Sequence, residues 1–206
     1  MLPYEYLTIS SVNEIAEKIK MKRFFDLFLS LCLCILLALP IIVTAAFVRL
    51  TSTGNVLYWS DRVGRHNKLF KMPKFRSMRV NTPAVATHLL DNPAQFLTPI
   101  GSFLRKSSLD ELPQLWSILK GDMSFVGPRP ALFNQHDLIA LRTEYGVHEL
   151  TPGLTGWAQI NGRDELEIIE KVKLDTEYLH KKSFALDLKI MLLTAIKVLY
   201  RQGIKH

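Results

Sequence analysis

Cysteine is scarce in this 206-residue sequence, which contains only Cys32 and Cys34. One residue separates them inside an apolar run, and neither the spacing nor the setting suits a structural disulfide or a zinc site. The six histidines are scattered, without the short spacings of metal ligands. We therefore expect no disulfide framework and no metal bound by histidine or cysteine, and we interpret the cysteines as small apolar residues of a helix.

Signatures of nucleotide and nucleic-acid binding are also missing. The glycine-rich segment 152–163 lacks the lysine-serine ending of a Walker loop and the glycine spacing of a Rossmann loop. The formal net charge is +7, but no zinc-finger spacing and no RNA-recognition motif accompanies it. Basic charge without such motifs favours an anionic membrane surface or phosphorylated substrates over nucleic acid.

One long hydrophobic run stands out. No charged residue occurs from Leu27 to Val48, and a helix needs about 20 apolar residues to cross a hydrocarbon core. Basic residues flank both ends of the run, with four between residues 18 and 23 and seven between residues 49 and 76. A single membrane span should show more lysine and arginine on one side than on the other, and this run does not.

Pro40 lies deep in that run, where it leaves the carbonyl of Leu36 without a helical partner and bends the helix. A sharp bend would return the chain to the same membrane face. We therefore predict an N-terminal extension with a short amphipathic helix (1–20), a re-entrant membrane helix broken near Pro40 (21–50) and a cytoplasmic catalytic domain (51–206). The alternative is a kinked spanning helix with the N-terminal tail outside.

The rest of the sequence predicts an α+β fold that is predominantly helical. Strands over 55–60 and 69–78 indicate a short antiparallel hairpin, whose second strand Pro73 interrupts. Residues 81–97 and 152–163 are expected to be loops. Helices are predicted over residues 112–119, 131–145, 165–180 and 186–200. The last of these resembles an interfacial amphipathic helix, and a core helix is the alternative.

The segment from Arg105 to Gln114 carries two adjacent carboxylates, Asp110 and Glu111. One interpretation is structural, because Ser108 and Glu111 have the spacing of a capping box and acids in a first helical turn suit the helix dipole. The other is chemical. Adjacent carboxylates can hold a divalent metal beside a phosphate, and a carboxylate can attack phosphorus. The segment alone leaves both interpretations open.

Three further segments offer groups for a phosphorylated ligand. Arg129 lies between two prolines, which would either pre-position its guanidinium for a phosphate or merely hold a solvated arginine on a rigid turn. Lys74 and Arg76 would share one face of a strand and suit a diphosphate, or else protect a strand edge. In the glycine-rich loop, Gln159 and Arg163 offer polar contacts, unless the loop is only structural.

Together, these segments behind an apolar run with a central proline resemble the bacterial sugar transferase family, the monotopic polyprenyl phosphate phosphoglycosyl transferases. The resemblance implies transfer of a sugar-1-phosphate from a UDP-sugar to polyprenyl phosphate, with release of UMP and a covalent aspartyl phosphosugar intermediate. It matches Asp110 to the nucleophile and Glu111 to its partner, with magnesium held by the pair. The implied substrate-binding residues are Lys74, Arg76, Arg105, Arg129, Gln159 and Arg163.

The same resemblance implies a bacterial inner-membrane protein with its catalytic domain on the cytoplasmic face, initiating glycan assembly. Its expected partners are a UDP-sugar, a polyprenyl phosphate lipid and the membrane, and not nucleic acid; later glycosyltransferases and a second copy of the chain stay open. Leu39 departs from the family, which often has serine before the membrane proline. The main alternative is a non-catalytic membrane scaffold for glycan-assembly enzymes, against which the intact Asp110–Glu111 pair argues. A third interpretation is a basic peripheral protein that binds anionic lipid or nucleic acid.

Overall fold

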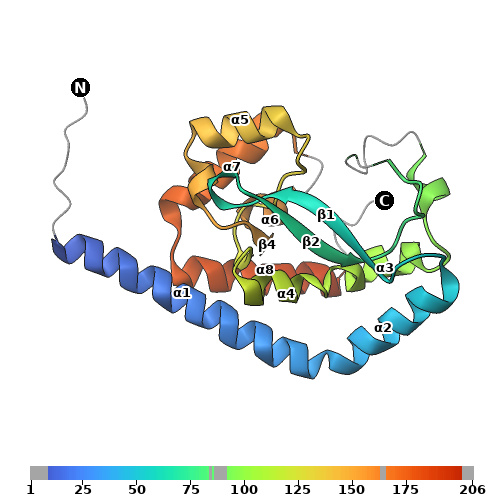
Figure 1. Ribbon diagram of the computed structural model, residues 1–206. Coiled ribbons are helices and arrows are strands. Elements are labelled where there is room, and N and C mark those ends of the chain that lie inside the picture. The colour runs from blue at the N-terminus through green and yellow to red at the C-terminus, as the bar shows by residue number, and fades with distance from the viewer. Residues whose placement is uncertain (1–8, 84, 86–91, 163–165, 201–206) are drawn as a thin grey trace.

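Two helices form a bent arm along one side of the molecule (Figure 1). The computed structural model describes residues 9–83, 85, 92–162 and 166–200. Helix α1 spans Ile9–Leu36 and helix α2 spans Ala38–Thr51. Among the described residues, no one helix has the length and apolar character to cross a membrane. The pair Ile19–Leu36 and Ala38–Thr51, bent by 63°, passes that test jointly on length and composition, as a broken span or a re-entrant loop would.

The arm bends at Leu37, just before the predicted break at Pro40. Leu37 has φ −95° and ψ 10°, and the hydrogen bonds from Leu37 N to Leu33 O and from Ile41 N to Leu37 O, at 2.8 and 2.9 Å, continue on both sides of it. Pro40 has no amide hydrogen for the carbonyl of Leu36, and its ring crowds that carbonyl. The helix axis therefore changes direction in the turn that precedes the proline.

Helix α1 runs without a break through residue 20, where we expect the N-terminal extension to end. Residues 1–8 lie outside the described residues, and the division of the chain at residue 20 stays a prediction. Arg23 donates to the carbonyls of Ile118 and Leu119 at 2.6 and 2.7 Å. A cation there satisfies carbonyls left free at the end of another helix, α4 (Gln114–Lys120).

The neighbouring polar residues of α1 also fasten the arm. Lys22 Nζ lies 2.5 Å from the carboxylate of Asp187, which also accepts a hydrogen bond from the Tyr178 hydroxyl at 2.6 Å. Asp26 is buried and accepts from the amide of Phe125 at 3.1 Å. Two cations of the predicted membrane flank, Lys22 and Arg23, therefore bind the protein itself.

The predicted antiparallel hairpin is present. Strand β1 (Leu57–Val63) pairs with β2 (Leu69–Phe75) across the short 3-10 turn η1 (Arg65–Asn67). Pro73 does not interrupt the second strand as expected but pairs opposite Trp59. A two-stranded sheet has only edge strands, where a missing amide donor is tolerated.

The glycine-rich segment 152–163 is not the loop that we predict. Strand β4 (Gly153–Thr155) pairs in parallel with β3 (Ser124–Val126), and helix α6 (Trp157–Asn161) follows. A Cβ on Gly153 would lie 2.1 Å from the backbone nitrogen of Gly127. The glycines are therefore present because two backbones approach closely, which composition alone does not distinguish from loop flexibility.

The remaining described segments are helical turns and helices around these strands. Their bounds are η3 Pro93–Phe96, α3 Gly101–Ser107, η4 Leu109–Glu111, α5 His136–Glu144, η5 Val147–Glu149, α7 Ile168–Lys181 and α8 Phe184–Leu199. The helix predicted from residue 131 begins only at His136, because Leu132 forms a bridge to Arg62 and donates its amide to the Gln135 side chain. Residues 163–165 lie outside the described residues.

The main core gathers side chains from α1, α4, β3 and α8, including Ile118, Val126 and Ile190. On helix α4, Trp116 is 59% exposed while Ile118 is fully buried. Helix α8 buries Ile190 in the core and exposes Leu192 on another side. It therefore combines the core and surface roles that the sequence leaves as alternatives.

We expect Gly127→Ala to destabilise the protein, because a Cβ there would lie 2.3 Å from Thr151 O and 2.9 Å from Gly153 N. Relief would require separating β3 from β4, at a cost of about 1–3 kcal/mol. Gly64→Ala is the matched control, since its nearest atoms lie at 3.1 Å. Thermal unfolding of the purified protein in detergent measures both. Equal midpoints for the two variants would contradict this account of the strand pair.

Candidate active site

Asp110 and Glu111 lie in the single 3-10 turn η4 that joins α3 to α4. The preceding Ser108 has φ 56° and ψ 16°, a left-handed conformation that is uncommon outside glycine and asparagine. Asp110, two residues later, is buried and only 7% exposed. The capping-box interpretation of this segment is wrong, because Ser108 forms no side-chain cap and its backbone conformation does not suit one.

Glu111 joins three segments that are distant in the sequence. Its Oε1 accepts from Lys74 Nζ on β2 at 2.6 Å and lies 3.4 Å from Arg129 NH2, in the proline-flanked turn after β3. The side chains of Lys74 and Glu111 are 16% and 22% exposed, so water screens their attraction only in part. The structure thus brings together four of the residues that the resemblance implies for the site: Asp110, Glu111, Lys74 and Arg129.

The two carboxylates have opposite pKa shifts. Burial raises the pKa of Asp110, the nearby cation of Lys74 lowers it and the charge of Glu111 raises it again, which leaves the pKa at about 6. Burial also acts to raise the pKa of Glu111, but Lys74 and Arg129 outweigh it and hold that pKa well below its usual range. At neutral pH most Asp110 side chains are therefore ionised, and nearby cations offset the charge of Asp110 less than they offset the charge of Glu111.

Two other predicted arginines lie in different surroundings. Arg105 on α3 contacts the sulfur of Met78 at 3.6 Å, and its charge helps to lower the pKa of Asp110. Arg76 instead points to the end of α2, where its NH1 donates to Thr53 O at 2.7 Å. The structure therefore places Arg105 beside the carboxylates but gives Arg76 no contact with them.

The last two predicted residues belong to the glycine-rich segment. Gln159 lies on α6, and neither polar atom of its buried amide has a hydrogen-bond partner in the described part of the chain. Its Oε1 is near Gly156, whose own backbone packs against Gly127. Gln159 is thus close to the start of the turn that carries Arg129. Arg163 lies outside the described residues.

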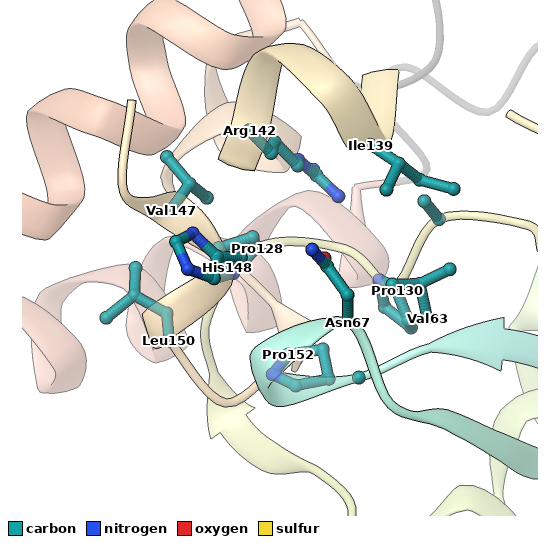
Figure 2. Close-up of a pocket in the computed structure, with 12 residues that line it drawn as sticks. Val63, Asn67, Pro128, Pro130, Ile139, Arg142, Val147, His148, Leu150 and Pro152 are labelled. Atoms are coloured by element: carbon teal, nitrogen blue, oxygen red, sulfur yellow. The ribbon is translucent and has the colours of Figure 1, made fainter. Parts of the chain in front are cut away.

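An ion pair that sequence analysis missed holds that turn. Arg142 on α5 binds Asp175 on α7 through Nε and NH2, at 3.0 and 2.6 Å, and its NH1 donates to the backbone carbonyl of Arg129 at 2.8 Å. In Figure 2 the Arg142 guanidinium points toward the cavity that Pro128 and Pro130 line. Arg142 thereby connects α7 to the backbone of Arg129, whose side chain contacts Glu111.

A weak signal for this pair exists in the sequence. Asp175 lies three residues after Val172 and three before Tyr178, both buried on α7. A carboxylate on the apolar face of an amphipathic helix usually has a buried partner. The periodicity identifies such a residue, but it does not identify Arg142 as the partner.

Asp110 and Glu111 are also the residues predicted to hold magnesium. In the part of the chain that the structure describes, no group of three or more histidine, cysteine or acidic side chains is arranged to hold a metal ion. Magnesium commonly takes only one or two protein carboxylates and completes its shell with water and substrate phosphates. The adjacent carboxylates fit such a site. The raised pKa of Asp110 shows that the nearby cations do not fully offset the cost of burying its negative charge.

Comparison with protein families matches residues 17–201 to the family described as bacterial sugar transferase. The matched region includes all the segments that form the site. The chain belongs to the bacterial sugar transferase family. The expected family is therefore confirmed.

Individual relatives align over most of this chain. It is 44% identical over 188 residues to the uncharacterized sugar transferase EpsL of Bacillus subtilis, covering 90% of this chain and 91% of that protein. It is 38% identical over 205 residues to the UDP-glucose:undecaprenyl-phosphate glucose-1-phosphate transferase of Escherichia coli, covering 96% and 43%. It is 35% identical over 217 residues to the undecaprenyl-phosphate galactose phosphotransferase of Salmonella typhimurium, covering 97% and 45%. The chain thus spans less than half the length of these last two relatives.

We expect Asp175→Asn to reduce sugar transfer at least tenfold and to destabilise the fold, because it leaves the Arg142 charge buried without its partner. Breaking such a pair costs about 3–5 kcal/mol. Glu170→Gln, an exposed change on the same helix, is the matched control. Thermal midpoints and separate kcat and KM values for the donor provide the measurements.

The double variant Arg142→Met with Asp175→Leu separates positioning from stability. Apolar replacement of a buried ion pair is often neutral for stability, but here it would leave the Arg129 carbonyl without its donor. We expect recovered thermal stability with transfer still impaired. Recovery of both would show that the pair has no positioning role.

The pKa of Asp110 predicts a pH dependence. The resemblance implies that Asp110 is the nucleophile, and a carboxylate attacks phosphorus only when it is ionised. The value of kcat/KM should therefore fall about tenfold from pH 7 to pH 5, with an apparent pKa of about 6. Lys74→Met removes a cation that lowers this pKa and should move the midpoint to higher pH. The initial rate of UMP release across pH measures both. A flat profile over this range would contradict the assignment of Asp110.

Proposed function

We propose that this chain moves a sugar-1-phosphate from a UDP-sugar to polyprenyl phosphate with release of UMP, and that Asp110 is the nucleophile. The observation that carries the proposal is the buried carboxylate of Asp110, which lies beside Glu111. The charge of Glu111 is already offset by Lys74 and Arg129. An ionised carboxylate with few partners is available to attack phosphorus. The names of the Escherichia coli and Salmonella relatives support the reaction class.

The proposed transfer has two steps. A carboxylate oxygen of Asp110 attacks the β-phosphorus of the UDP-sugar, the bond to the UMP oxygen breaks, and UMP leaves with that electron pair. A phosphate oxygen of the polyprenyl phosphate then attacks the same phosphorus, and the bond to Asp110 breaks. The carboxylate is restored and the lipid carries a sugar diphosphate. Such a division into two steps gives ping-pong kinetics.

Both steps bring anions together, so fixed positive charge is required. Arg105 and Arg129 each act on the ionisation of Asp110 and are the cations that we assign to the donor phosphates. Lys74 keeps Glu111 ionised and in place. Magnesium held by Asp110 and Glu111 would supply further compensation for the donor diphosphate.

We place the bent pair α1–α2 in the membrane as a re-entrant anchor, with the catalytic domain on the cytoplasmic face of the bacterial inner membrane. Large apolar side chains exposed on four helices support this placement: Phe47 and Leu50 on α2, Phe103 on α3, Trp116 on α4 and Leu192 on α8, which are 55%, 83%, 62%, 59% and 63% exposed. So many exposed apolar side chains are unfavourable in water and stable against lipid.

The donor is proposed from the relatives' names. They specify glucose for the Escherichia coli protein and galactose for the Salmonella protein, so hexose donors should be tested first and N-acetylhexosamine donors beside them. The product would be the first lipid-linked sugar of a bacterial glycan. Later glycosyltransferases would then extend it.

We expect Asp110→Asn to abolish both UMP release and the phosphosugar adduct, because an amide cannot form the acyl-phosphate. Full-length protein in detergent would receive magnesium, undecaprenyl phosphate and each UDP-sugar, and intact-protein mass spectrometry would detect the adduct in the absence of lipid. Asp137→Asn, an exposed change on α5, is the matched control. If Asp110→Asn retained turnover, Asp110 would not be the nucleophile.

The non-catalytic scaffold makes the opposite prediction. Folded wild-type protein would then release no UMP with any donor, and Asp110→Asn would change nothing. The low pKa of Glu111 and the high pKa of Asp110 favour the enzyme, because adjacent carboxylates with divergent pKa values are typical of catalytic sites.

A further inference from the structure

A second cavity, of about 640 Å³, lies beyond the end of α2. Its walls are residues 51–53, where α2 ends, and two segments within 76–81 and 95–99. Neither Asp110 nor Glu111 lines it. The cavity is therefore separate from the carboxylates, although its Arg76 wall continues directly from β2.

The walls are built by specific backbone contacts. Arg79 N donates to Phe96 O at 2.7 Å and Thr98 N donates to Ser77 O at 3.0 Å, so the two segments pair side by side. A Cβ on Gly101 would lie 2.1 Å from Ser77 O, which shows how closely α3 packs against this pair. Backbone hydrogen bonds and close packing therefore define the walls of the cavity.

Its charge is positive. Arg76 and Arg79 line it, and no acidic residue does so among the described residues. Arg76 is held in place by its bond to Thr53 O and by contact with Gly54, where an added Cβ would lie 2.4 Å from its NH1. Arg79 is exposed, and within the part of the chain that the structure describes its side chain forms no hydrogen bond or ion pair. One arginine is therefore held by a backbone carbonyl, and the other is exposed at the cavity wall.

The end of a helix usually disfavours an anion, because its carbonyls carry partial negative charge. At the end of α2, the hydroxyls of Thr51 and Ser52 donate to Phe47 O and Val48 O at 2.7 and 2.8 Å, and Arg76 donates to Thr53 O just beyond the helix. The two full positive charges of Arg76 and Arg79 outweigh the partial negative charge of one helix end. An anionic group with several oxygens is the complementary ligand.

We propose that this cavity binds the phosphate group of a membrane lipid. The inference rests on the membrane placement given under the proposed function, which sets the end of α2 at the depth of lipid head groups. Leu50, 83% exposed one residue before Thr51, would lie beside the acyl or isoprenoid chain. The volume suits a head group with its first carbons, since ligand pockets usually enclose about 300–1,000 Å³. A free phosphate ion would leave most of it empty.

Native mass spectrometry of the full-length protein in neutral detergent tests the proposal without any sugar donor. The ligands are undecaprenyl phosphate, phosphatidylglycerol and inorganic phosphate, each titrated separately, with phosphatidylcholine as the zwitterionic reference. We expect Arg79→Gln to weaken binding of at least one anionic lipid fivefold or more, and Arg79→Lys to restore part of it. Arg65→Gln is the matched control, because it removes the same charge from an exposed turn.

The lipid that responds identifies the source of the phosphate. If the binding of undecaprenyl phosphate depends on Arg79, the cavity is a second contact for the acceptor lipid. If the binding of phosphatidylglycerol depends on Arg79, the cavity holds a phospholipid. The proposal is overturned if neither lipid responds, if Arg65→Gln has the same effect, or if only inorganic phosphate depends on Arg79. Because no donor is present, these outcomes are independent of whether the wild-type chain releases UMP.

Discussion

The carboxylate of Glu111 is the contact on which the site depends. It receives Lys74 from β2 and Arg129 from the turn after β3, and it is covalently adjacent to Asp110. A partly buried carboxylate without cations would take up a proton more readily. The two cations keep Glu111 charged, and that charge in turn raises the pKa of Asp110. One shared anion thus holds three segments together and sets the ionisation of its neighbour.

The same arrangement explains why so much buried polar structure surrounds a small site. Arg129 reaches Glu111 from a turn whose backbone carbonyl accepts a hydrogen bond from Arg142, and Asp175 on a further helix binds that same guanidinium. Buried ion pairs add little net stability in general. Their value here lies in orientation, because a guanidinium aimed at a phosphate must be in place before the ligand arrives.

The bent arm is integrated with the catalytic part of the protein. Arg23 binds carbonyls at the end of α4, and Asp26 binds the amide of Phe125 on β3. Helix α4 begins directly after the turn that carries Asp110, and β3 leads to the turn that carries Arg129. The arm therefore contacts both segments of the site, and its depth in a membrane would fix the height of the chemistry above the lipid.

Local patterns in the sequence were enough to predict the bend near Pro40 and the β1–β2 hairpin, while the choice of Asp110 and Glu111 with their cations came from the family resemblance. The bend and the hairpin each depend on the chemistry of one residue or on a short periodicity. The sequence did not predict the parallel pairing of Ser124–Val126 with Gly153–Thr155, the left-handed Ser108 or the Arg142–Asp175 pair. Those features require segments far apart in the chain to meet. Only the packing of the whole fold decides which backbones approach, which glycines are required and which buried charge finds a partner.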